Sequence, residues 1–320
     1  MGRGASALAL CVAFTLPASI AARRQSSAVR EIAITIDDLP IAGVLPRSIE
    51  SSRVLTARLL AGIAAHHVPA IGFVNEDKLE TAAAAIDPQR TQLLRQWLDG
   101  GLELGNHGYS HRDLHLVPLD AFEQDVLKGE RVLRPLLAER HLAPRFFRHP
   151  FLHTGRDLAT RTGFERFLGE HGYRVAPVTV DNDEYIFAAA YDRSSSRGDA
   201  VLTARIGDAY VPYMESKMEF FERNSRELFG REMRQILLIH ANMLNADRFN
   251  ALATMLERRG YRFITMERAL EDPAFASPDT FVGPGGITWI HRWALSRGMP
   301  KSFYAGEPEA PRFVSESGQP

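Results

Sequence analysis

The chain has 320 residues, of which 45% are hydrophobic and 24% are charged, a composition that is ordinary for a globular protein. Its length allows one large domain or two small ones. The formal net charge is -1 and no basic stripe runs along the sequence, which excludes nucleic acid as an expected partner.

The start of the chain has the three-part pattern of a secretory signal peptide, which we assign to residues 1–22. A short basic start precedes an apolar run over residues 5–16, and small residues follow up to Ala22. The run is shorter than the roughly 20 residues of a membrane span, so we expect cleavage and no transmembrane segment in the mature protein. We therefore expect a secreted protein, periplasmic or extracellular, that begins with a flexible lead at 23–30. The single cysteine, Cys11, lies in the signal, so the mature chain has no cysteine ligand, nucleophile or disulfide.

Short strands and helices alternate through the rest of the chain. Apolar and β-branched runs predict strands at 31–36, 69–74, 102–104, 145–147, 173–180, 235–239 and 262–265. Helical spacing of apolar residues predicts helices at 51–66, 92–98, 119–137, 156–171 and 248–259, and a mostly helical stretch at 185–228. This order predicts an α/β fold with about seven parallel strands, closed as a barrel or left open.

The last part of the chain, residues 273–320, is richer in proline and glycine and contains Trp289 and Trp293. We expect a catalytic domain at 31–272 and a C-terminal extension at 273–320 whose short helix packs on the barrel. The alternative is that these tryptophans form a wall of the substrate groove, because sugar rings stack on aromatic faces.

Two adjacent acidic residues, Asp37 and Asp38, follow the first predicted strand. Adjacent strand residues point to opposite faces, so a strand end or a turn must bring both carboxylates to one site. Two carboxylates in one site repel each other unless a cation separates their roles. The alternative for the pair is a turn or a helix cap, where aspartate is common.

Two histidines, His107 and His111, come directly after the third predicted strand. Four residues apart on a helical turn, they lie on one face and within reach of one ion. Two histidines, one carboxylate and an open position make up a hydrolytic metal site, and a second carboxylate can then act as base. A surface pair is the alternative. His115 continues the spacing, and we expect it to be exposed beyond the site.

These two segments, Thr35–Asp38 and Gly105–Leu114, resemble the first two motifs of the polysaccharide deacetylase family, carbohydrate esterases with a NodB-homology domain. Counterparts of the later motifs follow in order, each at a strand end: Phe147–Phe151, Val180–Tyr185 and Leu238–His240. The resemblance covers residues 31–270 and implies a distorted (β/α) barrel with its site at the C-terminal rim.

The resemblance also implies a role for each motif residue. The metal ligands are Asp38, His107 and His111; the base is Asp37, held by Arg148; the oxyanion donor is the N–H of Phe151; the acid is His240, oriented by Asp181; and Tyr185 borders the acyl pocket. Zinc is the default metal for these ligands, and cobalt or nickel could replace it. Each late residue also has a structural alternative: Arg148 as an ion-pair partner, His240 as a core histidine, Asp181 as a helix cap.

Four departures from the family pattern indicate a divergent subgroup. Leu39 and Pro40 follow Asp38 in place of the usual glycine, Gly108 replaces a hydroxyl residue, and Tyr185 stands where tryptophan is usual. His149 adds a titratable group near the site.

The expected function is metal-dependent removal of N-acetyl groups from an acetylated amino sugar in a glycan of the chitin, peptidoglycan or exopolysaccharide type. The alternatives are an O-acetyl esterase acting on a xylan-like glycan, a hydrolase of C–N bonds in small non-sugar amides, and a catalytically silent glycan-binding module.

Overall fold

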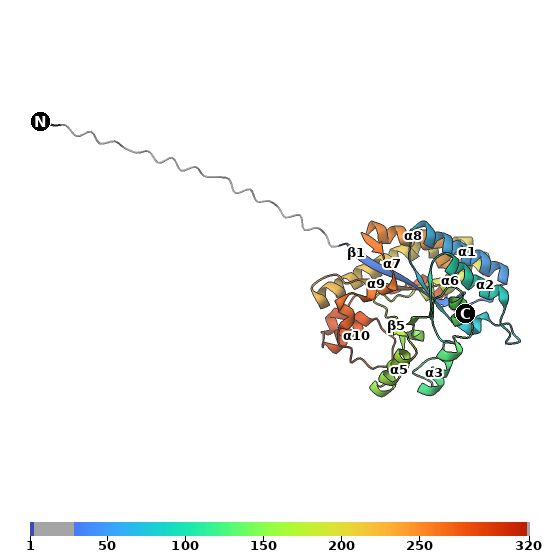
Figure 1. The fold of residues 1–320 in the computed structure, drawn as a ribbon. Coiled ribbons are helices and arrows are strands. Elements are labelled where there is room, and N and C mark those ends of the chain that lie inside the picture. Colours follow the sequence, from blue (N-terminus) through green and yellow to red (C-terminus); the bar gives the residue numbers. More distant parts are fainter. Residues whose placement is uncertain (3–28, 319–320) are drawn as a thin grey trace.

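The computed structural model describes residues 1–2 and 29–318, so the expected signal peptide and most of the expected lead lie outside the described residues. In the described part, parallel strands form one curled sheet with helices around it (Figure 1). The strands are β1 (Arg30–Leu39), β2 (Ile71–Val74), β3 (Glu103–Asn106), β4 (Phe146–Phe147), β5 (Arg174–Val175), β6 (Gln235–His240) and β7 (Tyr261–Phe263).

The order of the strands across the sheet is β5-β4-β3-β2-β1-β6, and β7 also pairs with β1. All pairings between these strands are parallel, which confirms the predicted distorted barrel. The predicted strand at 173–180 is regular only at its start, because Pro177 has no N–H to donate to a ladder. The segment then reaches β6 through a single bridge between Val180 and Leu237, which links the two ends of the curled sheet.

Helices cover the outside of the sheet. They are α1 (Ile49–Ala65), α2 (Pro88–Asp99), α3 (Leu119–Lys128), α4 (Leu133–Ala138), α5 (Leu158–Glu170), α6 (Glu184–Ser196), α7 (Ala200–Phe229), α8 (Met243–Arg258), α9 (Met266–Leu270), α10 (Trp289–Ser296) and α11 (Arg312–Ser317). Short 3-10 turns lie at Glu76–Leu79, Pro150–Leu152, Pro273–Ala276 and Lys301–Tyr304. None of the helices in the described part has both the length and the apolar character that a membrane span needs.

The prediction of one helix at 119–137 is wrong, because the chain breaks at Gly129 into α3 and α4. A side chain at Gly129 would come within 2.8 Å of the backbone of Gly108, which lies between the two site histidines. The break therefore lets α3 end directly against the histidine loop. The carboxylate of Glu76 then accepts the N–H groups of Val132 and Leu133 at 2.8 and 2.7 Å, and so caps α4.

The C-terminal segment is packed on the barrel. Trp289 and Trp293 of α10 are buried in the main hydrophobic core, with Trp293 only 1% exposed. These tryptophans therefore do not form a groove wall. Other parts of the extension do reach the site region, because Gly286 lines one cavity there and Ser315 and Gly318 line a second.

Candidate metal-dependent active site

The two acidic residues lie at the C-terminal end of β1, at the rim of the sheet. Asp37 is 2% exposed and pairs in register with His240 of β6. Asp38 has φ of 71°, a left-handed conformation that aspartate tolerates better than most residues. This conformation interrupts the strand alternation, so both carboxylates can face one site.

The two histidines lie in the loop after β3, and not on a helical turn. The Nδ1 of His107 lies 2.8 Å from the carbonyl oxygen of Arg148, which leaves its Nε2 free toward the carboxylates. Gly108 has φ of 77°, and a side chain there would come within 2.8 Å of Asp125, so glycine is required in this loop. Burial lowers the pKa of His107 and of His111, which favours the neutral imidazole that binds metals.

Three of these side chains converge on one point. The Oδ1 of Asp38 lies 3.8 Å from the Nε2 of His107 and 3.7 Å from the Nε2 of His111. One candidate ligand atom from each residue lies within 4.8 Å of the other two. Two atoms that each lie about 2.0–2.2 Å from one cation can be separated by 3.7–3.8 Å, as these are, and the Oδ1 of Asp38 is otherwise contacted by the ammonium of Lys78 at 3.2 Å. The residues present therefore fit a divalent metal.

The second carboxylate, Asp37, lies beside this triad. One of its oxygens, Oδ2, is 3.8 Å from the Nε2 of His107 and 3.7 Å from the Nε of Arg148, and the other is buried without a hydrogen bond. Burial raises the pKa of Asp37 to about 6, and the positive charge of Arg148 opposes this rise. Arg148 is completely buried and donates from Nη2 to the hydroxyl of Thr35 at 2.7 Å, so its position is fixed. A carboxylate with such a pKa is suited to accept a proton near neutral pH.

On the opposite side of Asp37, His240 is paired with Glu184 and not with Asp181. The Nδ1 of His240 lies 2.7 Å from a carboxylate oxygen of Glu184, the first residue of α6. Burial lowers the pKa of His240, but Glu184 outweighs it and raises that pKa to about 9. Asp181 instead accepts the backbone N–H of Asn182 at 2.9 Å, and burial raises its own pKa to about 6. The imidazole can therefore carry the proton that an acid must donate.

The site opens into two adjoining cavities. The first, of about 470 Å³, contains the triad together with Asp37, Asp181, His240, Phe151, Tyr185, His149, Leu152, Leu238 and Gly286. The second, of about 510 Å³, shares Asp38, Tyr185 and His240 with it and runs along α6 to the C-terminal helix α11. At the junction Tyr185 is 60% exposed, and Phe151 near the triad is 53% exposed. Eight of the nine site residues expected from the sequence therefore line one cavity, and the ninth, Arg148, lies behind it, 3.7 Å from Asp37.

The chain also resembles known proteins. Residues 24–167 match the model of the polysaccharide deacetylase family. This part of the chain, a little under half of its length, is similar to the polysaccharide deacetylases. A search of curated proteins finds no match.

Solved structures with the same fold include carbohydrate esterase family 4 (CE4) proteins. A mutant of a CE4 family pseudoenzyme from Bacillus anthracis is 15% identical, with 76% of this chain and 68% of that chain covered and a TM-score of 0.50. A family 4 carbohydrate esterase from Streptomyces lividans, in complex with acetate, is 17% identical, with 75% and 95% covered and a TM-score of 0.48. The peptidoglycan deacetylase PdaC from Bacillus subtilis is 18% identical, with 76% and 91% covered and a TM-score of 0.47. At 15% identity, the likeness to the first of these structures concerns the fold alone.

Three residues of the candidate site were missed in the sequence. Glu184 could have been suspected from its position three residues after Asp181, in the first turn of the next helix. Asp125 of α3 steadies the histidine loop by accepting the N–H groups of Tyr109 and Ser110 at 2.9 and 3.2 Å. Lys78 lies 3.2 Å from the Oδ1 of Asp38; burial acts to raise the pKa of Asp38, but Lys78 and nearby histidines lower it overall. No sequence motif marks the last two residues.

Proposed function

We propose that this protein is a metal-dependent deacetylase that removes N-acetyl groups from amino sugars of a glycan. The observation that carries the proposal is one cavity in which a ligand triad, a buried carboxylate and a charged imidazole meet. Exposed aromatic rings at Tyr185 and Phe151 beside this cavity offer faces on which a sugar ring can stack.

Each residue has a defined task in this reaction. A divalent cation, with zinc as our proposed metal, would be held by Asp38, His107 and His111 and supplies a Lewis acid that polarises the acyl carbonyl and activates water. Asp37 accepts a proton from the attacking water, in a position fixed by the charge of Arg148.

The second half of the reaction depends on two further groups. The N–H of Phe151 stabilises the negative charge that develops on the carbonyl oxygen. His240, kept charged by Glu184, donates its proton to the leaving amine, which is a poor leaving group without one.

The complete set of ligands and proton carriers favours turnover over a silent binding module. The test is acetate release by metal-loaded protein from N-acetylated chitin oligomers, peptidoglycan, acetylated xylan and a small aryl acetamide. We expect release from an N-acetylated glycan, loss on chelation, recovery with Zn²⁺, and no activity in Asp38→Ala. Release from xylan alone would favour the esterase, release from the aryl acetamide alone the small-amide hydrolase, and glycan binding without release the silent module.

We also propose that the protein acts outside the cytoplasm, on the basis of the signal-like pattern in residues 1–22. N-terminal sequencing of the protein recovered from cell fractions tests this. A mature chain in the periplasm or medium that begins near residue 23 is the expected result, and an uncleaved cytoplasmic chain would contradict it.

A further inference from the structure

The turn that carries Phe151 has an unfavourable backbone. Phe151 and Leu152 are consecutive residues other than glycine, and both have positive φ, 58° and 56°. Residues other than glycine seldom adopt this backbone conformation, and it persists only where surrounding contacts hold it. The ring of Phe151 also packs on the ligand His111, with centroids 4.5 Å apart. The position of the turn relative to the triad must therefore be maintained by contacts outside it.

One set of contacts is a second cluster of polar residues, Asp113, His115 and His153. The Oδ1 of Asp113 lies 2.7 Å from the Nδ1 of His153 and accepts the backbone N–H of His115 at 2.7 Å. The rings of His115 and His153 stack in parallel, 4.0 Å apart at 8°. The expectation that His115 is exposed is wrong, because this stack leaves it only 9% exposed.

This cluster contains residue types that can bind a metal, but its geometry indicates a structural contact that links two loops. An imidazole binds a metal in the plane of its ring, so two parallel stacked rings cannot both point at one ion. The Nε2 of His115 is also occupied, because it accepts the N–H of Gly155 at 3.2 Å. Asp113 and His115 belong to the histidine loop and His153 closes the Phe151 turn, so the cluster joins the metal ligands to the oxyanion donor.

The C-terminal extension contacts the same turn from another side. A Cβ atom at Gly286 would collide with the carbonyl oxygen of Phe151, so the backbone of residue 286 packs directly on the turn. The extension is itself anchored nearby, since the N–H of Trp289 donates to the carbonyl of Val178 at 2.8 Å and Arg292 donates to the hydroxyl of Thr154 at 2.7 Å.

We propose that Asp113, His153 and Gly286 are positioning residues that hold the Phe151 turn at the metal triad. The inference rests on the proposed function, because the position of the oxyanion donor matters only where acyl transfer occurs. None of the three needs to touch the reacting atoms. The C-terminal extension then supports catalysis by holding the Phe151 turn in place from outside the barrel.

Two pairs of variants test this on metal-loaded protein. Gly286→Ala should displace the turn, whereas Gly285→Ala is a matched control, because a side chain at Gly285 meets nothing within 4 Å. His153→Ala removes the hydrogen bond to Asp113, whereas His153→Asn keeps a donor close to the position of Nδ1. Metal content and thermal melting confirm that each variant is folded and loaded.

The signature of a displaced oxyanion donor is an equal loss on different leaving groups. We expect Gly286→Ala and His153→Ala to lower kcat by about tenfold or more on both an acetamide and an aryl acetate, with KM little changed. Gly285→Ala and His153→Asn should stay within about threefold of wild type. By contrast, loss of the acid in His240→Ala should affect the acetamide and spare the aryl acetate, whose leaving group needs no proton.

Hydrogen exchange of the segment 150–155 gives a readout that needs no activity. We expect faster exchange in Gly286→Ala and His153→Ala than in their controls. Unchanged exchange, a loss confined to the acetamide, or an equal loss in Gly285→Ala would each overturn the proposal. A wild-type protein that hydrolyses neither probe contradicts the proposed function, while exchange still decides whether these residues hold the turn.

Discussion

Asp37 is buried and has one carboxylate oxygen without a hydrogen bond. The charge of Arg148 lies nearby but does not cancel the rise in the pKa of Asp37 that burial causes. These three properties support the proposed role of Asp37 as the base. A structural carboxylate would normally be satisfied by short hydrogen bonds, whereas the closest nitrogen of Arg148 is 3.7 Å away.

We predict that Asp37→Asn keeps the metal but loses activity by about 10²–10⁴. The amide has nearly the same shape as the carboxylate and cannot accept the proton of the attacking water. Acetate release measured together with elemental analysis checks this. Activity within a few-fold of wild type would make another group the base.

The pairing of His240 with Glu184 predicts a specific pH dependence. Activity needs Asp37 ionised and His240 protonated, so it should rise through the pKa of Asp37, about 6, and fall through that of His240, about 9. A bound divalent cation adds positive charge next to both groups and moves both limbs to lower pH.

We predict that Glu184→Gln shifts the alkaline limb down by about one pH unit or more, because the charge of Glu184 is the main influence that raises the pKa of His240. The amide introduced by this substitution can still accept hydrogen bonds, so the metal content should not change. Asp181→Asn, which removes no hydrogen bond to His240, should shift this limb less. The reverse ranking of the two profiles would restore Asp181 as the partner.

The convergence of the four expected ligand and base residues could be predicted from the sequence, because short local motifs contain them. Asp37, Asp38, His107 and His111 follow strands, and parallel strands bring their ends to one rim. The partner of His240 was not predictable in this way. Asp181 and Glu184 are both acidic residues of one motif, and only the turn into α6 decides which of them reaches the imidazole.

At the scale of elements, the link between β6 and α6 positions His240, the proposed acid. Asn182 precedes α6; its side-chain N–H donates to the carbonyl of Leu238 in β6 at 2.8 Å, and its oxygen accepts the N–H of Glu184 at 3.0 Å. One side chain therefore fixes the start of the helix against the strand that carries His240.

We predict that Asn182→Ala lowers the free energy of unfolding by about 1–3 kcal/mol, because two buried backbone groups lose their partner. Urea unfolding followed by circular dichroism measures the effect. Asn250→Ala, at an exposed position on α8, is the matched control and should change stability by less than about 0.5 kcal/mol. Equal stability of the two variants would show that Asn182 does not hold this junction.

Of the two wrong element predictions, one has a tertiary cause and the other a local cause. The predicted helix at 119–137 has a continuous apolar pattern, but Gly129 packs on Gly108, a contact between residues far apart in the sequence. The strand at 173–180 ended early because Pro177 interrupts the ladder. The break in the helix could be predicted only with knowledge of this tertiary contact, whereas Pro177 could be recognised in the sequence.

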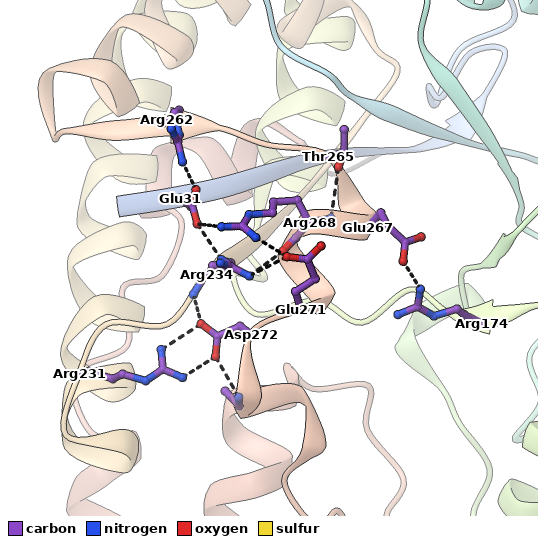
Figure 2. A network of polar contacts seen from close by, with 11 residues as sticks. Glu31, Arg174, Arg231, Arg234, Arg262, Thr265, Glu267, Arg268, Glu271 and Asp272 are labelled. Atoms are coloured by element: carbon purple, nitrogen blue, oxygen red, sulfur yellow. Dashed lines mark hydrogen bonds and ion pairs between the residues drawn. The ribbon is translucent and has the colours of Figure 1, made fainter. Parts of the chain in front are cut away.

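For the molecule as a whole, the candidate site and an ion-pair network lie at opposite ends of the sheet. The proposed catalytic groups follow the C-terminal ends of the strands, whereas the network surrounds the N-terminal end of β1 (Figure 2). In this network Glu31 contacts Arg262 and Arg234, and Asp272 accepts from Arg231 and from the backbone N–H of Arg234 at 2.9 Å each. The network joins β1, β7 and the segment before β6 to the chain after α9.

We predict that Glu31→Gln lowers the free energy of unfolding by about 1–2 kcal/mol at neutral pH and leaves acetate release unchanged. The hydrogen bond from Arg262 lowers the pKa of Glu31 below its ordinary value of 4.5. The contribution of ionised Glu31 to the free energy of unfolding is therefore present above that pH and is lost as the pH falls. The loss of stability caused by Glu31→Gln should therefore be smaller in urea titrations at acidic pH. Glu50→Gln, whose parent side chain is 74% exposed, serves as control, and a penalty that grows toward acid would contradict the argument.

The direction of β1 has a practical consequence for attaching the protein to a surface. The strand begins at Arg30 beside the network and reaches Asp37 and Asp38 roughly 25 Å further along the chain. An affinity tag or tether joined ahead of residue 30 would therefore be attached far from the cavity of the candidate triad. At the other end, Gly318 lines the side cavity, so a carboxyl-terminal fusion would be held at its mouth. Immobilisation through the amino end is thus the orientation for testing the proposed binding of a glycan.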